Sequence, residues 1–149
     1  LYADNLEGWF AKEIAEDFPE NRRLTQKILQ DESKLEEIVR LVGMDALSPK
    51  EQLTMETARM IREDFLFQNG FDPVDAYSSL NKQYRLLKSI LTFMDVAESK
   101  VVEEDFDFKK LQSLPVKEDI AQSSFCAEED VDATFDKIDE AIRSQISAL

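Results

Sequence analysis

The stretch LVGMDALSPKEQLT, Leu41–Thr54, decides the fold because one helical pattern ends in it and another begins. Gly43 follows a run of apolar residues at helical spacing, and a glycine there ends a helix in a left-handed conformation. Ser48 suits the helix N-cap, Pro49 the first helical position, and Glu51 can accept a hydrogen bond from the Ser48 amide. The stretch therefore predicts a tight, well-capped turn between two antiparallel helices.

Apolar residues recur at helical spacing on both sides of this turn. A short helix is expected over residues 1–17, and Pro19 is expected to open the helix that leads into the turn. The helix after the turn should end near residue 67, and Asp72 with Pro73 should start a long helix that reaches about Ser99. The apolar stripes are Leu24, Ile28, Leu35, Ile38, Val39 and Val42 before the turn, Leu53, Met60, Ile61 and Phe65 after it, and Tyr77, Leu80, Tyr84, Leu87, Leu91 and Met94 in the long helix.

The last third of the chain continues the helical pattern. The acidic segment EEDFDF, residues 103–108, precedes two weaker helical stretches at 109–113 and 116–123 and a final helix over about 129–148. Only 3 glycines and 4 prolines interrupt the 149 residues. We therefore predict an all-α antiparallel helical bundle with a protruding helix-turn-helix and a C-terminal helical extension. Residues 1–102 would form the bundle with its hairpin tip near 43–51, and residues 103–149 would pack on the same domain.

Composition restricts the function. The formal net charge of -14 argues against nucleic acid or an anionic membrane as a partner, although a basic protein partner is permitted. The single cysteine, Cys126, excludes an internal disulfide and favours a reducing compartment. No apolar run is long enough to span a membrane, and no signal peptide precedes the first helix. The first residue is Leu1 rather than methionine, which suggests a fragment of a longer chain.

The residue types also argue against an independent enzyme. The absence of histidine removes the commonest general base and metal ligand. Neither the P-loop pattern nor the dinucleotide-binding glycine pattern occurs, so the chain has no phosphate site of its own. The 32 acidic residues form no calcium-binding loop pattern. We therefore predict no catalytic residue and no metal ligand in this chain.

A second unusual segment is FLFQNGF, residues 65–71. Its three phenylalanines surround Gln68, Asn69 and Gly70 at a helix end. Phenylalanine can stack on a planar ligand such as a base, carboxamides can bond the edge of the base, and glycine allows a close approach. From the residues alone, the favoured interpretation is nevertheless that the phenylalanines belong to the core and Asn-Gly is only a turn.

The long segment from LQDESKLEEIVRLVGMDALSPKEQLT to DPVDAYSSLNKQYRLLKSILTFMD resembles the C-terminal helical region of the catalytic A subunit of V-type and archaeal-type rotary ATPases, in the prokaryotic form. The start, LYADNLEGWF, and the segment LPVKEDIAQS near the end are similar to the same subunits. The resemblance implies that the chain is roughly the last quarter of a subunit whose nucleotide-binding domain, with the catalytic lysine, glutamate and magnesium ligand, lies upstream.

The resemblance also implies roles for two groups of residues. ALSPKEQLT is similar in position to the ELSEED loop that pushes on the rotor in the related F-type beta subunit, so Asp45, Ser48, Lys50 and Glu51 would form the tip of a lever. The lysine and Pro49 dilute the acidity of that loop, so shape would matter more than charge. In FLFQNGF, the phenylalanine that covers adenine in the family corresponds to Phe71.

In the intact subunit, Gln68, Asn69 and Gly70 would line the adenine pocket beside this ring, where many relatives have alanine in place of the glycine. The intact subunit would bind ATP or ADP with magnesium and hydrolyse or synthesise ATP while a proton or sodium ion is transported. Its expected partners are the B subunits of the catalytic hexamer and the central stalk, at the cytoplasmic face of a membrane but not inserted in it. The isolated chain would be inactive. A free-standing acidic adaptor that binds other proteins through a helix groove is the alternative.

Overall fold

The computed structural model describes residues 16–66 and 80–149, and in this part of the chain every regular element is helical. The expected helix over 1–17 and the expected start of the long helix at Asp72 and Pro73 lie mainly or wholly outside the described residues. None of the described helices is both long and apolar enough to cross a membrane. The predicted all-α bundle is confirmed.

Two helices form the hairpin predicted from the first stretch. Helix α2, Phe18–Val42, has Pro19 in its first turn, as the sequence indicates. A short 3₁₀ turn, η1, Met44–Ala46, connects it to helix α3, Pro49–Met60. A π-helical segment, η2, Ile61–Leu66, directly continues α3.

The remaining helices cover the other side of the bundle. Helix α6, Leu80–Val101, is followed by the short helices α7, Phe108–Gln112, and α8, Pro115–Gln122. Two 3₁₀ turns, η3, Ser123–Phe125, and η4, Glu128–Asp130, lead to the last helix, α9, Val131–Ser147. The weaker stretches predicted from sequence thus form real helices, and their bounds agree within two residues.

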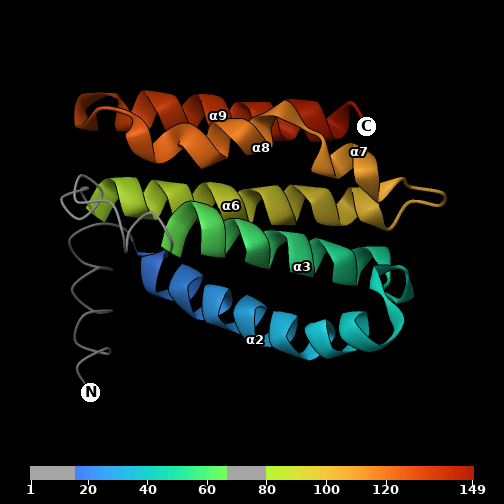
Figure 1. Ribbon diagram of the computed structural model, residues 1–149. Coiled ribbons are helices and arrows are strands. Elements are labelled where there is room, and N and C mark those ends of the chain that lie inside the picture. Colours follow the sequence, from blue (N-terminus) through green and yellow to red (C-terminus); the bar gives the residue numbers. More distant parts are fainter. Residues whose placement is uncertain (1–15, 67–79) are drawn as a thin grey trace, which may run out of the picture.

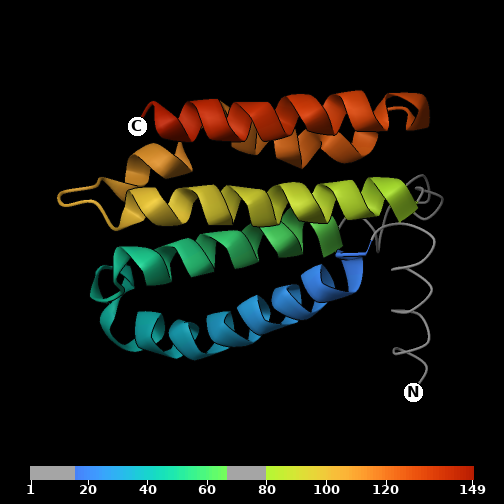
Figure 2. The ribbon, with the colours of Figure 1, turned by 180° about the vertical axis from the view of Figure 1, so that it is seen from behind.

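The long helices lie side by side in the order α2, α3, α6 and then α9, with α8 beside α9 (Figures 1 and 2). Helix α6 is central because it packs against α3 on one side and most extensively against α9 on the other. The turn between α2 and α3, the end of α6 and the C-terminus of the chain lie at the same end of the bundle (Figure 1). We call the part of the α2–α3 hairpin that lies at this end, from Ile38 to Glu51, the hairpin tip.

The core runs through the interface of α6 with α3 and α9. The predicted apolar stripe of the last helix is buried along its whole length. Of the predicted stripe of α6, Tyr84 and Leu87 are buried, whereas Leu91 and Met94 are only partly buried. Ile90 and Phe93, on another side of the helix, are fully buried. A helix enclosed on several sides has no single apolar face, which is why a one-stripe pattern describes only part of it. The buried residues of α9 are Val131, Phe135, Ile138, Ile142 and Ile146.

Ion pairs supplement the apolar contacts between helices. Arg85 of α6 contacts Asp132 at 3.0 Å and Asp136 at 2.6 Å on α9. Lys117 of α8 pairs with Glu56 of α3, and the side chains of both residues are largely buried. Since a buried charge is costly without its partner, the Lys117–Glu56 pair helps to fix how α8 is placed relative to α3.

Candidate functional site: the hairpin tip

The turn begins at a glycine that the backbone requires. Gly43 ends α2 with φ of 91° and ψ of 165°, and its amide donates to the Val39 carbonyl at 2.9 Å. The sequence predicts a left-handed helical conformation at this glycine. The φ value is positive as expected, but the ψ value places Gly43 in an extended region that only glycine adopts readily. A Cβ at this position would meet no atom within 4 Å, so only the backbone excludes other residues.

The restart of the helix is the capping box that the sequence predicts. The Glu51 amide donates to Ser48 Oγ at 3.2 Å, and the Ser48 amide donates to Glu51 Oε1 at 2.9 Å. Leu47 is buried beneath the turn, and Gln52 Nε2 donates to the Leu47 carbonyl at 3.0 Å. The backbone at the tip is therefore held by local hydrogen bonds and one buried anchor, which makes it stiff.

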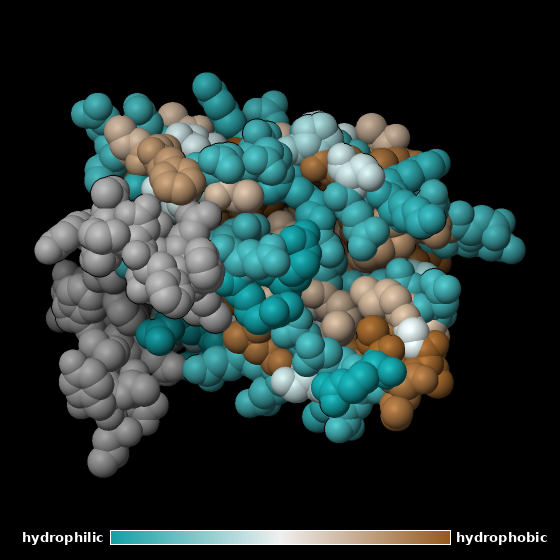
Figure 3. Space-filling view, viewed as in Figure 1, coloured by the Kyte–Doolittle hydropathy of each residue, from teal (hydrophilic) through white to brown (hydrophobic). Residues whose placement is uncertain are grey.

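The outer surface of the tip is apolar, and this feature is not evident from the periodicity alone. Leu41 is 83% exposed and Val42 66% exposed, and Ile38 and Met44 are also exposed. In the space-filling view, hydrophobic surface gathers over the turn between α2 and α3, at the lower right (Figure 3). We call these four residues the apolar patch. The one signal in the sequence is the placement of Leu41 and Val42 together just before the glycine that ends the helix.

Of the apolar stripe in α2, Ile28 is buried, whereas Leu24, Ile38 and Val42 are exposed. The physical reason is that α3 covers one side of α2 only, and no described element packs against the other side near the tip. Exposed apolar patches on small proteins often mark sites of interaction with other proteins.

The predicted lever residues lie together, although not all at one point. Ser48, Lys50 and Glu51 line a shallow groove of about 290 Å³ between α2 and α3, where Asp31 and Lys34 stand opposite. Asp45 is exposed on η1, outside this groove. Acidic and basic side chains alternate here, so the tip carries no strong field of one sign. The expectation that shape matters more than acidity at the lever tip stays a prediction.

The other predicted site cannot be placed. Gln68, Asn69, Gly70 and Phe71 lie outside the described residues, so their assignment to an adenine pocket stays a prediction. The described chain stops just before them, in the π-helical segment η2. Burial is the main cause that raises the pKa of Asp64, in this segment, to about 6. In the described part of the chain no group of three or more acidic or cysteine side chains is placed to hold a metal ion.

Comparison with known proteins identifies the domain. The sequence model of one family, described as the C-terminal domain of V and A type ATP synthase, matches residues 7–111. The chain belongs to this family. The resemblance found in the sequence is thereby confirmed, and the matched range includes α2, α3 and α6 with the hairpin tip.

Individual relatives agree with the family match. The V-type ATP synthase alpha chain of Acetivibrio thermocellus is 47% identical over 149 residues, which are all of this chain and 25% of that protein. The alpha chain of Thermoanaerobacter pseudethanolicus is 44% identical and alpha chain 1 of Clostridium tetani is 42% identical, with the same coverage. The chain thus spans about a quarter of the length of these relatives and corresponds to the C-terminal domain of a V-type ATP synthase alpha chain.

Proposed function

We propose that this domain couples the nucleotide state of an ATP synthase alpha chain to rotation of the central stalk, and that the hairpin tip is the contact with the stalk. The observation that carries the proposal is the combination of a stiff turn and an uncovered apolar patch at the same end of the bundle. The family supports the proposal, because it consists of C-terminal domains of V and A type ATP synthases.

The geometry supports transmission of force along the hairpin. Helices α2 and α3 run side by side from the tip to the centre of the bundle, and α3 packs against α6. Leu53, Met60 and Ile61 bury the inner face of this hairpin in the main core. Because packed cores resist deformation, a displacement at the base of α3 would move the tip as part of a nearly rigid body.

The chemistry of the patch fits a moving contact. Apolar contact has no required direction, so a surface of Leu41 and Val42 could bear on successive faces of a rotating partner. Fixed salt bridges would instead have to break at each step. The mixed charges of Asp45, Lys50 and Glu51 around the patch do not select a strongly basic partner surface.

In the intact subunit, Gln68, Asn69, Gly70 and Phe71 would complete the adenine pocket while residues beyond this sequence bind the phosphates and magnesium of ATP or ADP. The subunit would then hydrolyse or synthesise ATP as a peripheral part of a membrane complex at its cytoplasmic face, with B subunits and central-stalk subunits as partners. The 149-residue chain lacks any phosphate-binding pattern, so by itself it would be inactive. The family match leaves the alternative of a free-standing adaptor without support.

The experiment changes the patch in the assembled ATP synthase. The double variant Leu41→Ser and Val42→Ser should reduce ion pumping per ATP hydrolysed at least several-fold, while ATP hydrolysis itself continues. Leu24→Ser is the matched control, because Leu24 is an exposed leucine of the same helix about 25 Å from the tip by the helical rise. Normal coupling in the double variant, or an equal loss in the control, would refute the proposed contact.

A further inference from the structure

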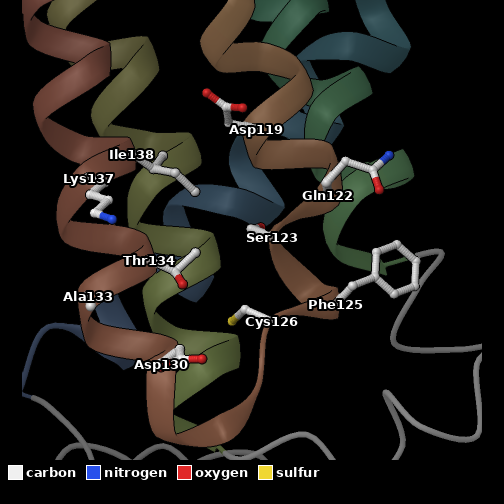
Figure 4. Close-up of a pocket in the computed structure, with 10 residues that line it drawn as sticks. All are labelled: Asp119, Gln122, Ser123, Phe125, Cys126, Asp130, Ala133, Thr134, Lys137 and Ile138. Carbon is white, nitrogen blue, oxygen red and sulfur yellow. The ribbon is translucent and has the colours of Figure 1, made fainter.

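A second surface feature lies away from the hairpin tip. A cleft of about 760 Å³ separates α8 and η3 from α9, near the start of α9 (Figure 4). Its lining residues all fall between Asp119 and Ile138, beyond the range 7–111 that the family model matches. The cleft therefore belongs to a part of the chain for which the family match assigns nothing.

The interior of the cleft is partly apolar and formed by ordered elements. Thr134 and Ile138 point from α9 toward α8, and the Cys126 sulfur lies between the two walls (Figure 4). Ser123 is buried, and its hydroxyl donates to the Ile120 carbonyl at 2.6 Å. The floor of the cleft is thus fixed by packing and by hydrogen bonds within α8 and η3.

An exposed aromatic ring stands at the edge of this cleft. Phe125 is 62% exposed, and its ring points away from α9 (Figure 4). The backbone on both sides of the ring is fixed, because Lys82 Nζ donates to the Ser124 carbonyl at 3.1 Å and to the Cys126 carbonyl at 2.8 Å. Lys82 is itself buried on α6, so this anchor is part of the core.

The exposure of Phe125 is therefore a property of the folded structure and not of a loose loop. Rigid, exposed aromatic side chains beside a cleft are typical anchors of protein interfaces. Ligands that are only polar would gain little from such a ring, so the feature favours a ligand with an apolar group.

Two carboxylates stand on the opposite walls. Asp119 lies on α8 and Asp130 directly before α9, both solvent-exposed, and neither pairs with a basic side chain in the part of the chain that the structure describes. Asp130 occupies the N-cap position of α9, yet its side chain makes no capping hydrogen bond. Lys137 on α9 is the one basic residue that lines the cleft among the described residues.

The two carboxylates favour a basic side chain over a metal ion. No group of three possible metal ligands occurs among the described residues, and two separated carboxylates alone make a poor metal site. Arginine and lysine are suited to single carboxylates at the rim of an interface, where they add specificity and speed association.

We propose that this cleft binds a segment of a partner protein that carries an apolar side chain between two arginine or lysine residues. The apolar side chain would contact Phe125 at the edge of the cleft, and the basic side chains would reach Asp119 and Asp130. This inference does not depend on the role of the hairpin tip, because the two surfaces share no residue.

The test uses Cys126, the only cysteine of the 149-residue chain, as a reporter inside the cleft. The rate at which dithiobis(nitrobenzoate) modifies this thiol is measured with increasing amounts of an alanine-based peptide that carries leucine flanked by arginines. The peptide should slow the modification, with half-maximal protection below about 1 mM. Matched peptides with glutamate in place of arginine, or alanine in place of leucine, should protect at least tenfold less well.

Variants of the chain test which residues bind the peptide. For each variant, the rate of Cys126 modification with peptide is compared with the rate of the same variant without peptide. Phe125→Ala should weaken protection about tenfold, and Asp119→Asn with Asp130→Asn should weaken it similarly and remove its salt dependence. Val102→Ala, a truncation of an exposed apolar residue elsewhere, should change nothing. The charge-matched control is the pair Asp95→Asn and Glu104→Gln, at exposed positions outside the cleft. Unchanged helical circular dichroism would show that each variant folds.

Three results would overturn the proposal. The basic peptide could fail to protect the wild-type thiol, or it could protect Phe125→Ala equally well. Protection that rises with the concentration of the chain alone would show that a second copy covers the cleft, and this result would also overturn it.

Discussion

The interface of α6 with α9 and the hairpin tip begin from similar sequence patterns and end in opposite environments. Both α9 and α2 carry apolar residues at helical spacing. In α9 the predicted stripe is buried from Val131 to Ile146, whereas in α2 Ile38 and Val42 remain exposed. The two helices differ in how they are covered: α9 lies against α6 along its length, whereas α2 packs against α3 on its inner side and its outer side is exposed at the tip.

The two regions are also stabilised in different ways. The interface of α6 with α9 depends on contacts between residues far apart in sequence, including Arg85 with Asp136 and Ser89 with Asp139 at 2.6 Å. The tip depends on local groups, namely Gly43, the Ser48–Glu51 capping box and buried Leu47. The tip is therefore ordered without being enclosed, so its apolar surface stays available for another protein.

The largest loss in the free energy of unfolding is expected from truncation of a side chain in the interface of α6 with α9. Phe135→Ala removes a fully buried ring, and the resulting cavity should lower the free energy of unfolding by about 3–5 kcal/mol. Urea denaturation of the 149-residue chain measures this change in the free energy of unfolding. A loss below about 1 kcal/mol would show that this interface does not carry the stability of the domain.

A smaller change in the free energy of unfolding, which depends on pH, is expected from substitution of Asp64, just beyond the other end of α3. Burial raises the pKa of Asp64 to about 6, so the folded chain holds this proton more tightly than the unfolded chain does. Ionisation therefore costs stability as the pH rises from about 4 to 6, and the cost is complete above pH 6. Asp64→Asn should raise the free energy of unfolding at pH 7.5 by about 1–2 kcal/mol, because solvent reduces the full cost of the shift.

At pH 4 the same substitution should have little effect, because Asp64 is largely protonated in the folded chain. Urea denaturation at both pH values tests this expectation. An equal change at pH 4 and pH 7.5 would show that the proton on Asp64 does not control stability.

The capping box should contribute about 1 kcal/mol to the tip. Ser48→Ala removes the acceptor of the Glu51 amide, and an exposed helix start then loses one hydrogen bond. Hydrogen exchange of the amides of residues 50–52 should accelerate more than exchange in α9. Ser33→Ala, at an exposed position on α2, is the control. Unchanged exchange at the tip would show that its stiffness has another source.

The smallest effect is expected from the apolar patch. Leu41→Ala should change the free energy of unfolding by less than about 0.5 kcal/mol, because the side chain is 83% exposed. The same denaturation measurement as for Phe135→Ala gives a direct contrast. A loss comparable to that of Phe135→Ala would mean that another part of the chain covers Leu41, which would remove the difference between the two regions.

Local signals in the sequence predict much of the fold. Pro19 and the Ser48–Glu51 pair mark helix starts that the structure confirms, because capping depends only on neighbouring residues. The stripe of α9 is predicted fully because α6 and α8 leave the rest of the helix surface exposed and bury a single stripe. The four proposed lever residues lie in η1 and at the start of α3, and their contact with a partner stays a prediction.

Other features depend on contacts that no local pattern contains. Periodicity shows that Ile38 and Val42 share a face, but not whether a further helix covers that face. The burial of Lys82 depends on carbonyl groups more than 40 residues away in η3 and the residue after it. The raised pKa of Asp64 likewise depends on the packing of α8 near η2. Such features arise from the tertiary arrangement and become visible only in the structure.

The central claim is that the hairpin tip contacts the central stalk, and site-directed cross-linking tests it most directly. A Cys126→Ser chain with Val42→Cys, labelled with a benzophenone maleimide and assembled into the ATP synthase, should cross-link to a central-stalk subunit on illumination and lose multiple-turnover ATP hydrolysis. The same label at Leu24→Cys should give no such product. Cross-links only to other subunits, or a stalk cross-link that leaves continuous hydrolysis intact, would contradict the account.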